Sequence, residues 1–355
     1  MLERNLSPRE MFIRMAAGHR PVHAFAHAGA KDPAGVAAWK SRAWPEVKAT
    51  LGLFPDSVPA NPLLLAEWRD RGLCKQKWII DVAPHISASL AVNYPEVHAG
   101  AKSPAILCCH GHGHGRFGKD SVMGNGAGPE IKADIENMNY DYGRQMAEAG
   151  FVTFAIDWIG FGERNDSRKP NCRSGLADGR DWCNLYYLHA TMFGMTSLSI
   201  NIAHGLAAAD FVRGFEEVDA GRMGVMGLSG GGTMALWLGL CDERFRATEV
   251  ICYSDVWAAF GIRDFNYCGM QVAPGLYRLV DLPDLQGLMA PRPMLIDIGA
   301  YDACFPVDTA MACYRKAEKV YQAAGAADRL ELDLFPGDHG WGGNKSIAFF
   351  TKHLG

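Results

Sequence analysis

Apolar residues recur along most of this chain in two patterns that alternate. One pattern is a short, nearly continuous apolar run, which is typical of strands buried on both faces of a sheet. Such runs occur at residues 105–109, 151–156, 222–228, 247–253, 294–298 and 330–335. The other pattern is the helical spacing of apolar residues, which occurs at 140–149, 196–215, 231–240, 309–324 and 345–354. This alternation predicts an α/β fold, with a mostly parallel, doubly wound sheet, helices on both faces and ligands beyond the carboxyl ends of the strands.

Residues before this alternation show different patterns. Three sites have the residues of helix starts: the capping box Ser7-Pro8-Arg9-Glu10, then Asp32-Pro33 and Asn61-Pro62. We therefore expect a helical N-terminal extension over residues 1–74, packed on an α/β domain that spans residues 75–355. That domain opens with two β-rich runs separated by Pro-His, at 75–83 and 86–94. These runs predict an antiparallel pair of strands.

Composition and charge limit the partners that this chain can have. Apolar residues make up 48% and charged residues 21%, which is typical of a globular protein and excludes a disordered or coiled-coil chain. The formal charge is −4, so no basic surplus is present to bind nucleic acid or an anionic membrane. Residues 182–209 carry no charge, but polar residues such as Asn184, His189 and Asn201 interrupt them. We interpret this stretch as a loop and a buried helix rather than a membrane span.

The N-terminus and the cysteines indicate a compartment. The first residues, MLERNLSPREMF, contain no apolar region of a secretory signal. The chain has 10 cysteines, with no C-x-x-C pair and no spacing of a disulfide framework. We therefore predict reduced thiols and a cytoplasmic protein. A homo-oligomer is compatible with the sequence, which does not fix the number of subunits.

The segment Gly227-Leu-Ser229-Gly-Gly231 matches G-x-S-x-G and joins a strand-like run to a helix-like run. A serine at such a turn is a nucleophile elbow, in which glycines are needed because side chains would collide. The N-terminus of the following helix favours the negative charge that develops in acyl transfer. We predict that Ser229 is a catalytic nucleophile. The alternatives are a packing turn or a phosphate loop, but the lysine of a phosphate loop is missing.

A base and an acid follow Ser229 in the chain order expected for such a site. His339 comes after the last strand-like run, where the base of this arrangement stands. Asp302 follows the run at 294–298 and would orient and stabilise the imidazole. Asp255, which follows the preceding run, could reach the same histidine and remains the alternative acid.

The run His110-Gly-His112-Gly-His114-Gly follows another predicted strand. A loop of this kind supplies a backbone N–H to an oxyanion hole. We predict the donors to be the N–H groups of His112 and Gly230, with Gly113 as the alternative to His112. His110, His112 and His114 could instead hold a metal ion, but the interleaved glycines argue against a strand that would align them. We expect no metal ion and no cofactor.

These residues together resemble the α/β-hydrolase superfamily, from about Lys75 to the C-terminus. Within it, the chain is similar to the branch of dienelactone-hydrolase-like and acetyl-xylan-esterase-like serine esterases. The stretches that carry this likeness are His110-Gly-His-Gly, residues 150–164, Asp219-Ala-Gly-Arg-Met-Gly and residues 285–293. The resemblance implies a serine esterase with Ser229, Asp302 and His339 at the triad positions. Dienelactone hydrolases proper have a cysteine in place of Ser229, so their substrate is not expected here.

The segment 163–195 is longer than a minimal connection between strand and helix, which is typical of a lid or a binding loop. Its aromatic residues Trp182, Tyr186 and Tyr187 are candidates for substrate binding. We predict a serine carboxylic ester hydrolase that forms an acyl-enzyme on a short-acyl, small or carbohydrate ester. A serine peptidase of the same fold and a metal-dependent hydrolase that uses the three histidines are the alternatives.

Overall fold

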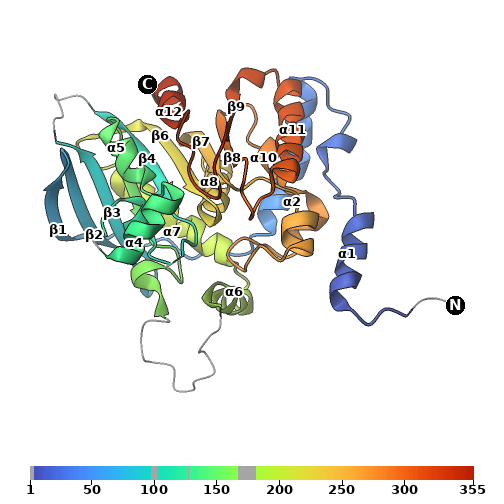
Figure 1. The fold of residues 1–355 in the computed structure, drawn as a ribbon, viewed down its shortest axis with the longest axis horizontal. Helices are drawn as coiled ribbons and strands as arrows, with labels where there is room; N and C mark the ends of the chain where they lie inside the picture. The colour runs from blue at the N-terminus through green and yellow to red at the C-terminus, as the bar shows by residue number, and fades with distance from the viewer. Residues whose placement is uncertain (1–3, 97–101, 115, 127, 167–180) are drawn as a thin grey trace.

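A computed structural model describes residues 4–96, 102–114, 116–126, 128–166 and 181–355 (Figure 1). These residues form a nine-stranded sheet in the order β1-β2-β3-β5-β4-β6-β7-β8-β9. The strands are β1 Leu63–Asp70, β2 Leu73–Ala83, β3 Ile86–Pro95, β4 Ser103–Cys109, β5 Val152–Ile156, β6 Val218–Leu228, β7 Phe245–Ile251, β8 Met294–Gly299 and β9 Leu330–Phe335. The pairs from β5 to β9 are parallel, whereas β1, β2 and β3 are antiparallel to their neighbours. The predicted α/β sheet and its antiparallel pair are confirmed.

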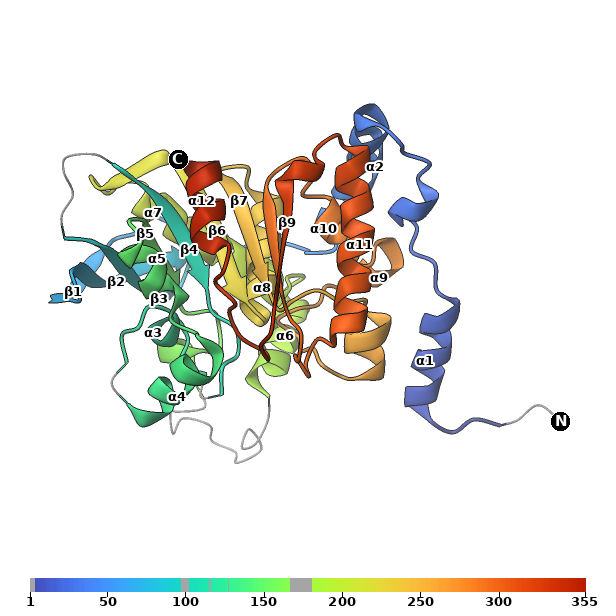
Figure 2. The ribbon, with the colours of Figure 1, turned by 45° about the horizontal axis from the view of Figure 1, so that its top comes forward.

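Helices cover both faces of the sheet (Figure 2). The longer ones are α1 Pro8–Gly18, α2 Pro33–Ala49, α4 Pro129–Met138, α5 Tyr142–Glu148, α6 Trp182–Met192, α7 Ser197–Val212, α8 Gly230–Cys241, α11 Val307–Ala323 and α12 Ser346–Leu354. The short ones are α3 Lys119–Val122, α9 Leu276–Leu279, α10 Leu282–Gly287, η1 Phe25–His27, η2 Gly162–Arg164, η5 Ala258–Arg263 and η6 Ala327–Arg329. All five helices predicted from the alternating pattern are present, within a few residues of their expected ends.

The core consists of two apolar clusters, one on each face of the sheet. Ile106 and Cys108 of β4 belong to the cluster that contains residues of α5 and α12. Leu107 and Cys109 of the same strand belong to the cluster that contains residues of α2, α7, α8 and α11. Successive side chains of a strand point to opposite faces, so a strand buried on both sides needs apolar residues at every position. This requirement explains the nearly continuous apolar runs in the sequence.

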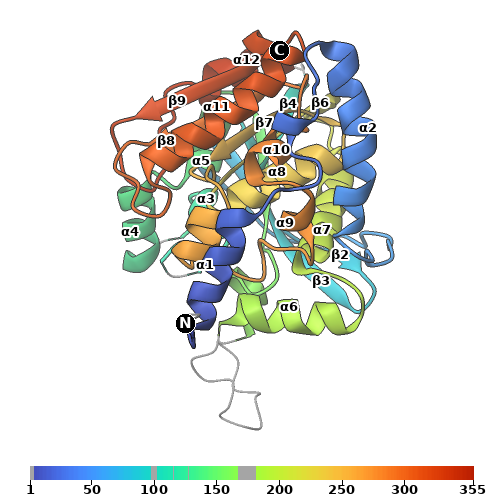
Figure 3. The same cartoon turned by 90° about the vertical axis from the view of Figure 1, so that its right-hand side faces the viewer.

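The N-terminal residues are only partly helical. Ser7 caps α1 and Asp32 caps α2, as predicted. Trp39 of α2 is buried in the core cluster that also contains residues of α8 and α11. Figure 3 shows α1 on the outside of the fold, near α9. Because its residues are not buried, α1 adds little to the core.

The helix predicted from Asn61-Pro62 is wrong, because this segment forms the edge strand β1. Arg71 and Gly72 both have positive φ, 53° and 73°, in the two-residue turn that joins β1 to β2. Such turns favour hairpins because their twist matches that of the strands. Pairing with β2 therefore prevails over the helical tendency of LLLAEWRD. The division of the chain at residue 75 stays a prediction, but the segment before it is not wholly helical.

The uncharged stretch at residues 182–209 contains the expected buried helix, α7, but its first part is the helix α6 rather than a loop. The side chains of Thr196 and Ser199 form the capping box that starts α7. Asn201 and His204 are buried along α7, within the protein core. Among the described residues, no helix is long and apolar enough to cross a membrane.

Candidate active site

Ser229 occupies the turn between β6 and α8. Its backbone has φ 61° and ψ −120°, a conformation that costs a non-glycine residue about 1–3 kcal/mol and is found mostly at functional sites. The N–H of Ser229 donates to the carbonyl of Ile251, at 2.8 Å, which holds the turn against β7. A Cβ at Gly231 would lie 1.9 Å from the carbonyl oxygen of Cys109. Only glycine fits there, which is the steric requirement expected of a nucleophile elbow.

Asp302 and His339 meet beyond the carboxyl ends of β8 and β9. Nδ1 of His339 lies 2.8 Å from Oδ2 of Asp302. The other carboxylate oxygen accepts hydrogen bonds from the N–H groups of Cys304, at 2.7 Å, and Phe305, at 3.0 Å. Burial by itself would raise the pKa of Asp302, but His339 and these N–H groups prevail and lower it below its usual value. Asp302 therefore faces His339 as a carboxylate.

Asp255, the alternative acid, has other partners. Its carboxylate accepts hydrogen bonds from the N–H of Val256, at 2.6 Å, and from the hydroxyl of Thr309, at 2.8 Å. Burial raises the pKa of Asp255 to about 6. Because Thr309 lies in the first turn of α11, Asp255 links the segment after β7 to that helix. Of the two aspartates, Asp302 is the one hydrogen bonded to His339.

The loop that carries His339 is fixed from two sides. The N–H groups of Ala300 and Tyr301 donate to the carbonyls of Phe335 and Gly337, both at 2.9 Å, so the loops after β8 and β9 run together. The Phe305 ring stacks on the His339 ring, with the planes 18° apart.

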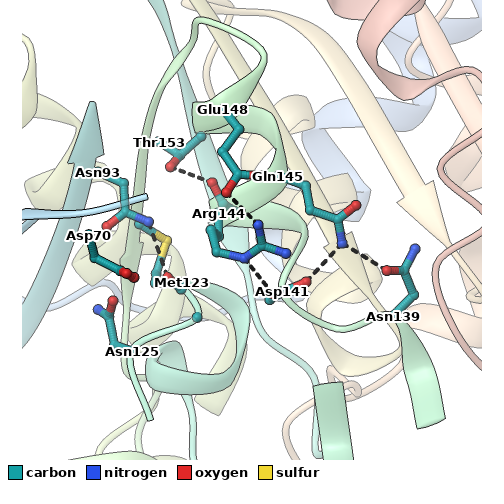
Figure 4. A network of polar contacts seen from close by, with 12 residues as sticks. Asp70, Asn93, Met123, Asn125, Asn139, Asp141, Arg144, Gln145, Glu148 and Thr153 are labelled. Atoms are coloured by element: carbon teal, nitrogen blue, oxygen red, sulfur yellow. Dashed lines mark hydrogen bonds and ion pairs between the residues drawn. The ribbon is translucent and has the colours of Figure 1, made fainter. Parts of the chain in front are cut away.

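On its other side, this loop is held by a polar network around α4 and α5, of which Figure 4 shows Asn139, Asp141 and Gln145. The Asn139 side chain donates to the carbonyl of Trp341, at 3.1 Å, and the Trp341 N–H donates to the carbonyl of Met138, at 2.9 Å. Gln145 donates to the side chains of Asn139 and Asp141, which fixes Asn139 in turn. The network thus restrains the backbone two residues after His339.

The loop after β4 packs directly on the elbow. The N–H of Gly111 donates to the hydroxyl of Tyr140, at 2.6 Å. A Cβ at Gly111 would lie 2.4 Å from the carbonyl oxygen of Leu228, so this loop can approach Ser229 only with glycine there. The His112 ring lies over Gly230, with Nδ1 3.1 Å from where a Cβ of Gly230 would stand. The two residues predicted to donate to an oxyanion are therefore neighbours.

The three histidines of the run have three different environments. Nε2 of the buried His110 accepts from the N–H of Trp158, at 3.0 Å, while Nδ1 of the exposed His114 is 2.8 Å from Asp134. His112 turns toward two thiols. The three rings therefore do not form a metal site, and the metal-dependent alternative based on them is wrong. Burial lowers the pKa of His110 to about 4, so this residue is a neutral core histidine.

The contact of His112 is one that the sequence did not reveal. Its Nε2 lies 3.3 Å from Sγ of Cys268 and 3.7 Å from Sγ of Cys183. A hydrogen bond with Cys268 lowers the pKa of the Cys183 thiol, as do His112 and the Arg116 guanidinium, although burial opposes them. No sequence signal could have indicated this cluster, because its members are far apart in the chain and follow no metal-binding spacing.

A small cavity of about 210 Å³ opens at Ser229. Its lining residues come from the β4 loop, the elbow and two later loops: His112, Ser229, Phe265, Asn266, Tyr267, Cys268, Gln271, Cys304 and Phe305. The predicted binding residues Trp182, Tyr186 and Tyr187 lie on α6 and are not among these. Tyr186 lines a separate cavity with Arg164 and His204. The role of the three aromatic residues in binding stays a prediction, and residues 167–180 of the predicted lid lie outside the described residues.

The model of the Abhydrolase family, Abhydrolase_7, matches residues 2–331 of this chain, and this match decides the family. The chain belongs to the Abhydrolase family. This result and the fold confirm the resemblance to the α/β-hydrolases. Over 287 residues, this chain is 26% identical to YtaP of Bacillus subtilis (strain 168), which is assigned as a hydrolase. The match covers 78% of this chain and 86% of YtaP.

Solved structures show the same fold. A protein from Bacteroides fragilis NCTC 9343, assigned as an acetyl xylan esterase, superposes with a TM-score of 0.73 at 18% identity, covering 94% of this Abhydrolase chain and 83% of that chain. A glucuronoyl esterase from Solibacter usitatus gives a TM-score of 0.65 at 16% identity, covering 92% of this chain and 95% of that chain. At such identities the likeness shows the fold alone.

Proposed function

We propose that this Abhydrolase protein is a serine carboxylic ester hydrolase with Ser229 as nucleophile, His339 as base and Asp302 as acid. The observation that carries this proposal is the 2.8 Å hydrogen bond between His339 and Asp302. The Phe305 ring, which stacks on His339, lines the same cavity as the strained Ser229. Chain order and position after successive strands support the same roles. Asp302 accepts from the Nδ1–H of His339, which leaves Nε2 without a proton and able to act as a base.

In the proposed reaction, Oγ of Ser229 attacks the ester carbonyl carbon while its proton passes to Nε2 of His339. The N–H groups of His112 and Gly230 stabilise the resulting oxyanion, together with the N-terminus of α8. The bond to the alcohol oxygen then breaks, and the alcohol leaves with the proton from His339. Water attacks the acyl-enzyme by the same steps and releases the carboxylic acid, which restores Ser229.

The cavity favours a small and uncharged acyl group. Its described lining contains no lysine or arginine, so it offers no cation to pair with a charged acyl group. Relatives of the same fold are described as an acetyl xylan esterase and as glucuronoyl esterases. We infer an acetyl or similarly short ester of a small or carbohydrate alcohol as the substrate class.

The test is hydrolysis of p-nitrophenyl acetate and butyrate by the wild type and by Ser229→Ala. We expect activity in the wild type, a loss of about 10⁶-fold in kcat when the nucleophile is removed, and full activity in the control Ser41→Ala, an exposed serine. A serine-reactive organophosphate should transfer its phosphoryl group once, to Oγ of Ser229, with loss of its leaving group. Activity that survives Ser229→Ala would contradict the proposal, and hydrolysis of an aminoacyl p-nitroanilide in preference to esters would favour the peptidase.

We also propose that the enzyme acts in the cytoplasm. Cysteines such as Cys108, Cys109 and Cys313 are buried as small apolar side chains of the core, a use that suits a reducing compartment. Fractionation of cells that produce the protein, followed by immunodetection, tests this location. Recovery from the medium or the cell envelope would contradict it.

A further inference from the structure

His112, Cys183 and Cys268 bring three metal-binding atoms to one point. Nε2 of His112 and the two sulfur atoms all lie within 4.8 Å of one another. They come from three separate segments, since His112 follows β4, Cys183 stands in the first turn of α6 and Cys268 lies in the connection between η5 and α9. Imidazole and thiolate are the ligands that zinc prefers, and most other divalent ions of the cell compete poorly for thiolates.

The spacing of these atoms agrees with a tetrahedral zinc site. With Zn–S at about 2.3 Å and Zn–N at about 2.05 Å, tetrahedral angles put nitrogen and sulfur about 3.6 Å apart. The two nitrogen-to-sulfur distances are 3.3 Å and 3.7 Å, so they lie on either side of this value. A metal ion could therefore enter with small rotations of the side chains.

The segments that carry the ligands are held together by other contacts. The Asn184 side chain accepts from the N–H of Gly269, at 2.8 Å, which joins α6 to the segment that carries Cys268. A Cβ at Gly269 would lie 2.9 Å from the carbonyl oxygen of Cys183, so the two backbones are in close contact. The His112 ring packs edge-on against Phe161, with centroids 5.3 Å apart. A metal site arranged in this way loses little conformational freedom when the ion binds.

The charges around the cluster also suit a dication. Two thiolates and Zn²⁺ sum to zero, which limits the cost of burial. Arg116 donates to Cys183 at 3.5 Å, but its charge is paired with Asp181 at 2.9 Å. Cys183 and Cys268 are buried, whereas His112 is half-buried and lines the cavity at Ser229 together with Cys268. The cluster therefore has an open side, and this side faces the cavity.

We propose that Nε2 of His112 and the sulfur atoms of Cys183 and Cys268 bind a zinc ion, whose fourth position is open toward the Ser229 cavity. Binding releases the two thiol protons to solvent, and the neutral imidazole keeps its proton on Nδ1. The ion joins α6 to the β4 loop and to the segment before α9, at the wall of the cavity. This proposal does not depend on ester hydrolysis.

The experiment is a titration of the full-length protein, reduced and freed of metal by a chelator, with Co²⁺ and then with Zn²⁺. We expect one equivalent of Co²⁺ to give the intense charge-transfer band of cobalt–thiolate bonds. Zn²⁺ should then abolish this band by displacing the bound Co²⁺. Zn²⁺ should also raise the melting temperature of the wild type, because it binds the folded state. Absence of the band in the wild type would overturn the proposal without any variant.

Variants then locate the site. Removal of a hydrogen-bond partner of a metal ligand typically weakens metal binding by roughly 10- to 100-fold. Removal of a ligand itself should weaken Zn²⁺ binding by more than this in each of three variants: Cys268→Ser, Cys183→Ser and His112→Gln. The control Cys241→Ser, at the end of α8, should bind like the wild type. Circular dichroism identifies any variant that does not fold, and the Zn²⁺ affinities of the variants that do fold decide whether these residues are the ligands.

A second cluster gives the test an alternative outcome. Cys252, Asp302 and His339 also place their ligand atoms within 4.8 Å of one another. Metal binding that persists in Cys268→Ser and is lost in His339→Gln would place the ion on that cluster and overturn the proposal. Binding that is lost in Cys268→Ser and kept in His339→Gln supports it.

Discussion

Asp302 and His339 are 37 positions apart in the chain and share a 2.8 Å hydrogen bond between Oδ2 and Nδ1. The bond forms because β8 and β9 are neighbours in the sheet and end at the same edge. Asp302 is also held by two backbone N–H groups, so its carboxylate cannot turn away without losing three hydrogen bonds. This arrangement fixes both the orientation and the tautomer of the imidazole.

Asp302→Asn should therefore reduce kcat strongly. The amide would favour the wrong tautomer of His339, which in the serine protease that serves as the reference case costs about 10⁴-fold in kcat. Asp255→Asn is the matched control, since Asp255 is bonded to Val256 and Thr309, and its kcat should stay within a few-fold of the wild type. Steady-state kinetics with p-nitrophenyl acetate measure both. Equal losses in the two variants would contradict the assignment of Asp302.

Gly231→Ala should destabilise the fold. The new Cβ would stand 1.9 Å from the carbonyl oxygen of Cys109 and force β4 and α8 apart. We expect at least the roughly 1–3 kcal/mol typical of overpacking, or no soluble protein. Gly18→Ala is the control, because nothing lies within 4 Å of that position, and its effect should stay below about 1 kcal/mol. Urea unfolding gives both free energies, and a Gly231→Ala variant as stable as the wild type would contradict the packing described here.

His110 should make the folded protein less stable in acid. Burial lowers the pKa of His110 to about 4 in the folded state, whereas the unfolded chain takes up a proton near pH 6.5. Between these values the unfolded state binds more protons, so stability falls as the pH falls from about 6.5 to about 4. The full effect of a 2.5-unit difference is roughly 3 kcal/mol.

Comparison of the wild type with His110→Gln isolates this contribution from that of other groups. We expect the free energy of unfolding of the wild type to fall more steeply toward acid than that of the variant, by at most about 1.4 kcal/mol per pH unit. Urea denaturation at pH 7.5, 6, 5 and 4.5 measures the difference. Parallel curves for the two proteins would show that folding does not lower the pKa of His110.

Asn139→Asp should impair catalysis at a distance. The change keeps a short side chain that tolerates the observed φ of 49°, but it replaces the N–H donor to Trp341 with an oxygen. We expect a loss of about 1–3 kcal/mol in stability and a lower kcat with KM nearly unchanged, since the loop of His339 is loosened. Asn125→Asp, which keeps its acceptor oxygen for Lys75, is the control. A fall in kcat for both variants alike would refute the positioning role of Asn139.

Local sequence predicted most of the fold because its determinants are local. A strand buried on both faces needs apolar residues at nearly every position, and the central strands β4 and β5 have them. The edge strand β9 alternates instead, with Glu331 and Asp333 between its leucines. The elbow was equally visible, because Gly227, Ser229 and Gly231 meet their steric requirement within five residues. The edge strand β1 was not, since its side chains are largely exposed and only the pairing with β2 makes it a strand.

The sequence by itself determined the alternation of the strands β4 to β9 with their main helices and the serine at the turn after β6. It also determined the positions after later strands where an acid and a base could stand. Tertiary structure decided which residues meet. It paired His339 with Asp302 rather than Asp255, separated the three histidines of the β4 loop, and brought His112 to Cys183 and Cys268. These contacts depend on which strand ends are adjacent and on how loops pack over them, and a pattern along one chain contains neither.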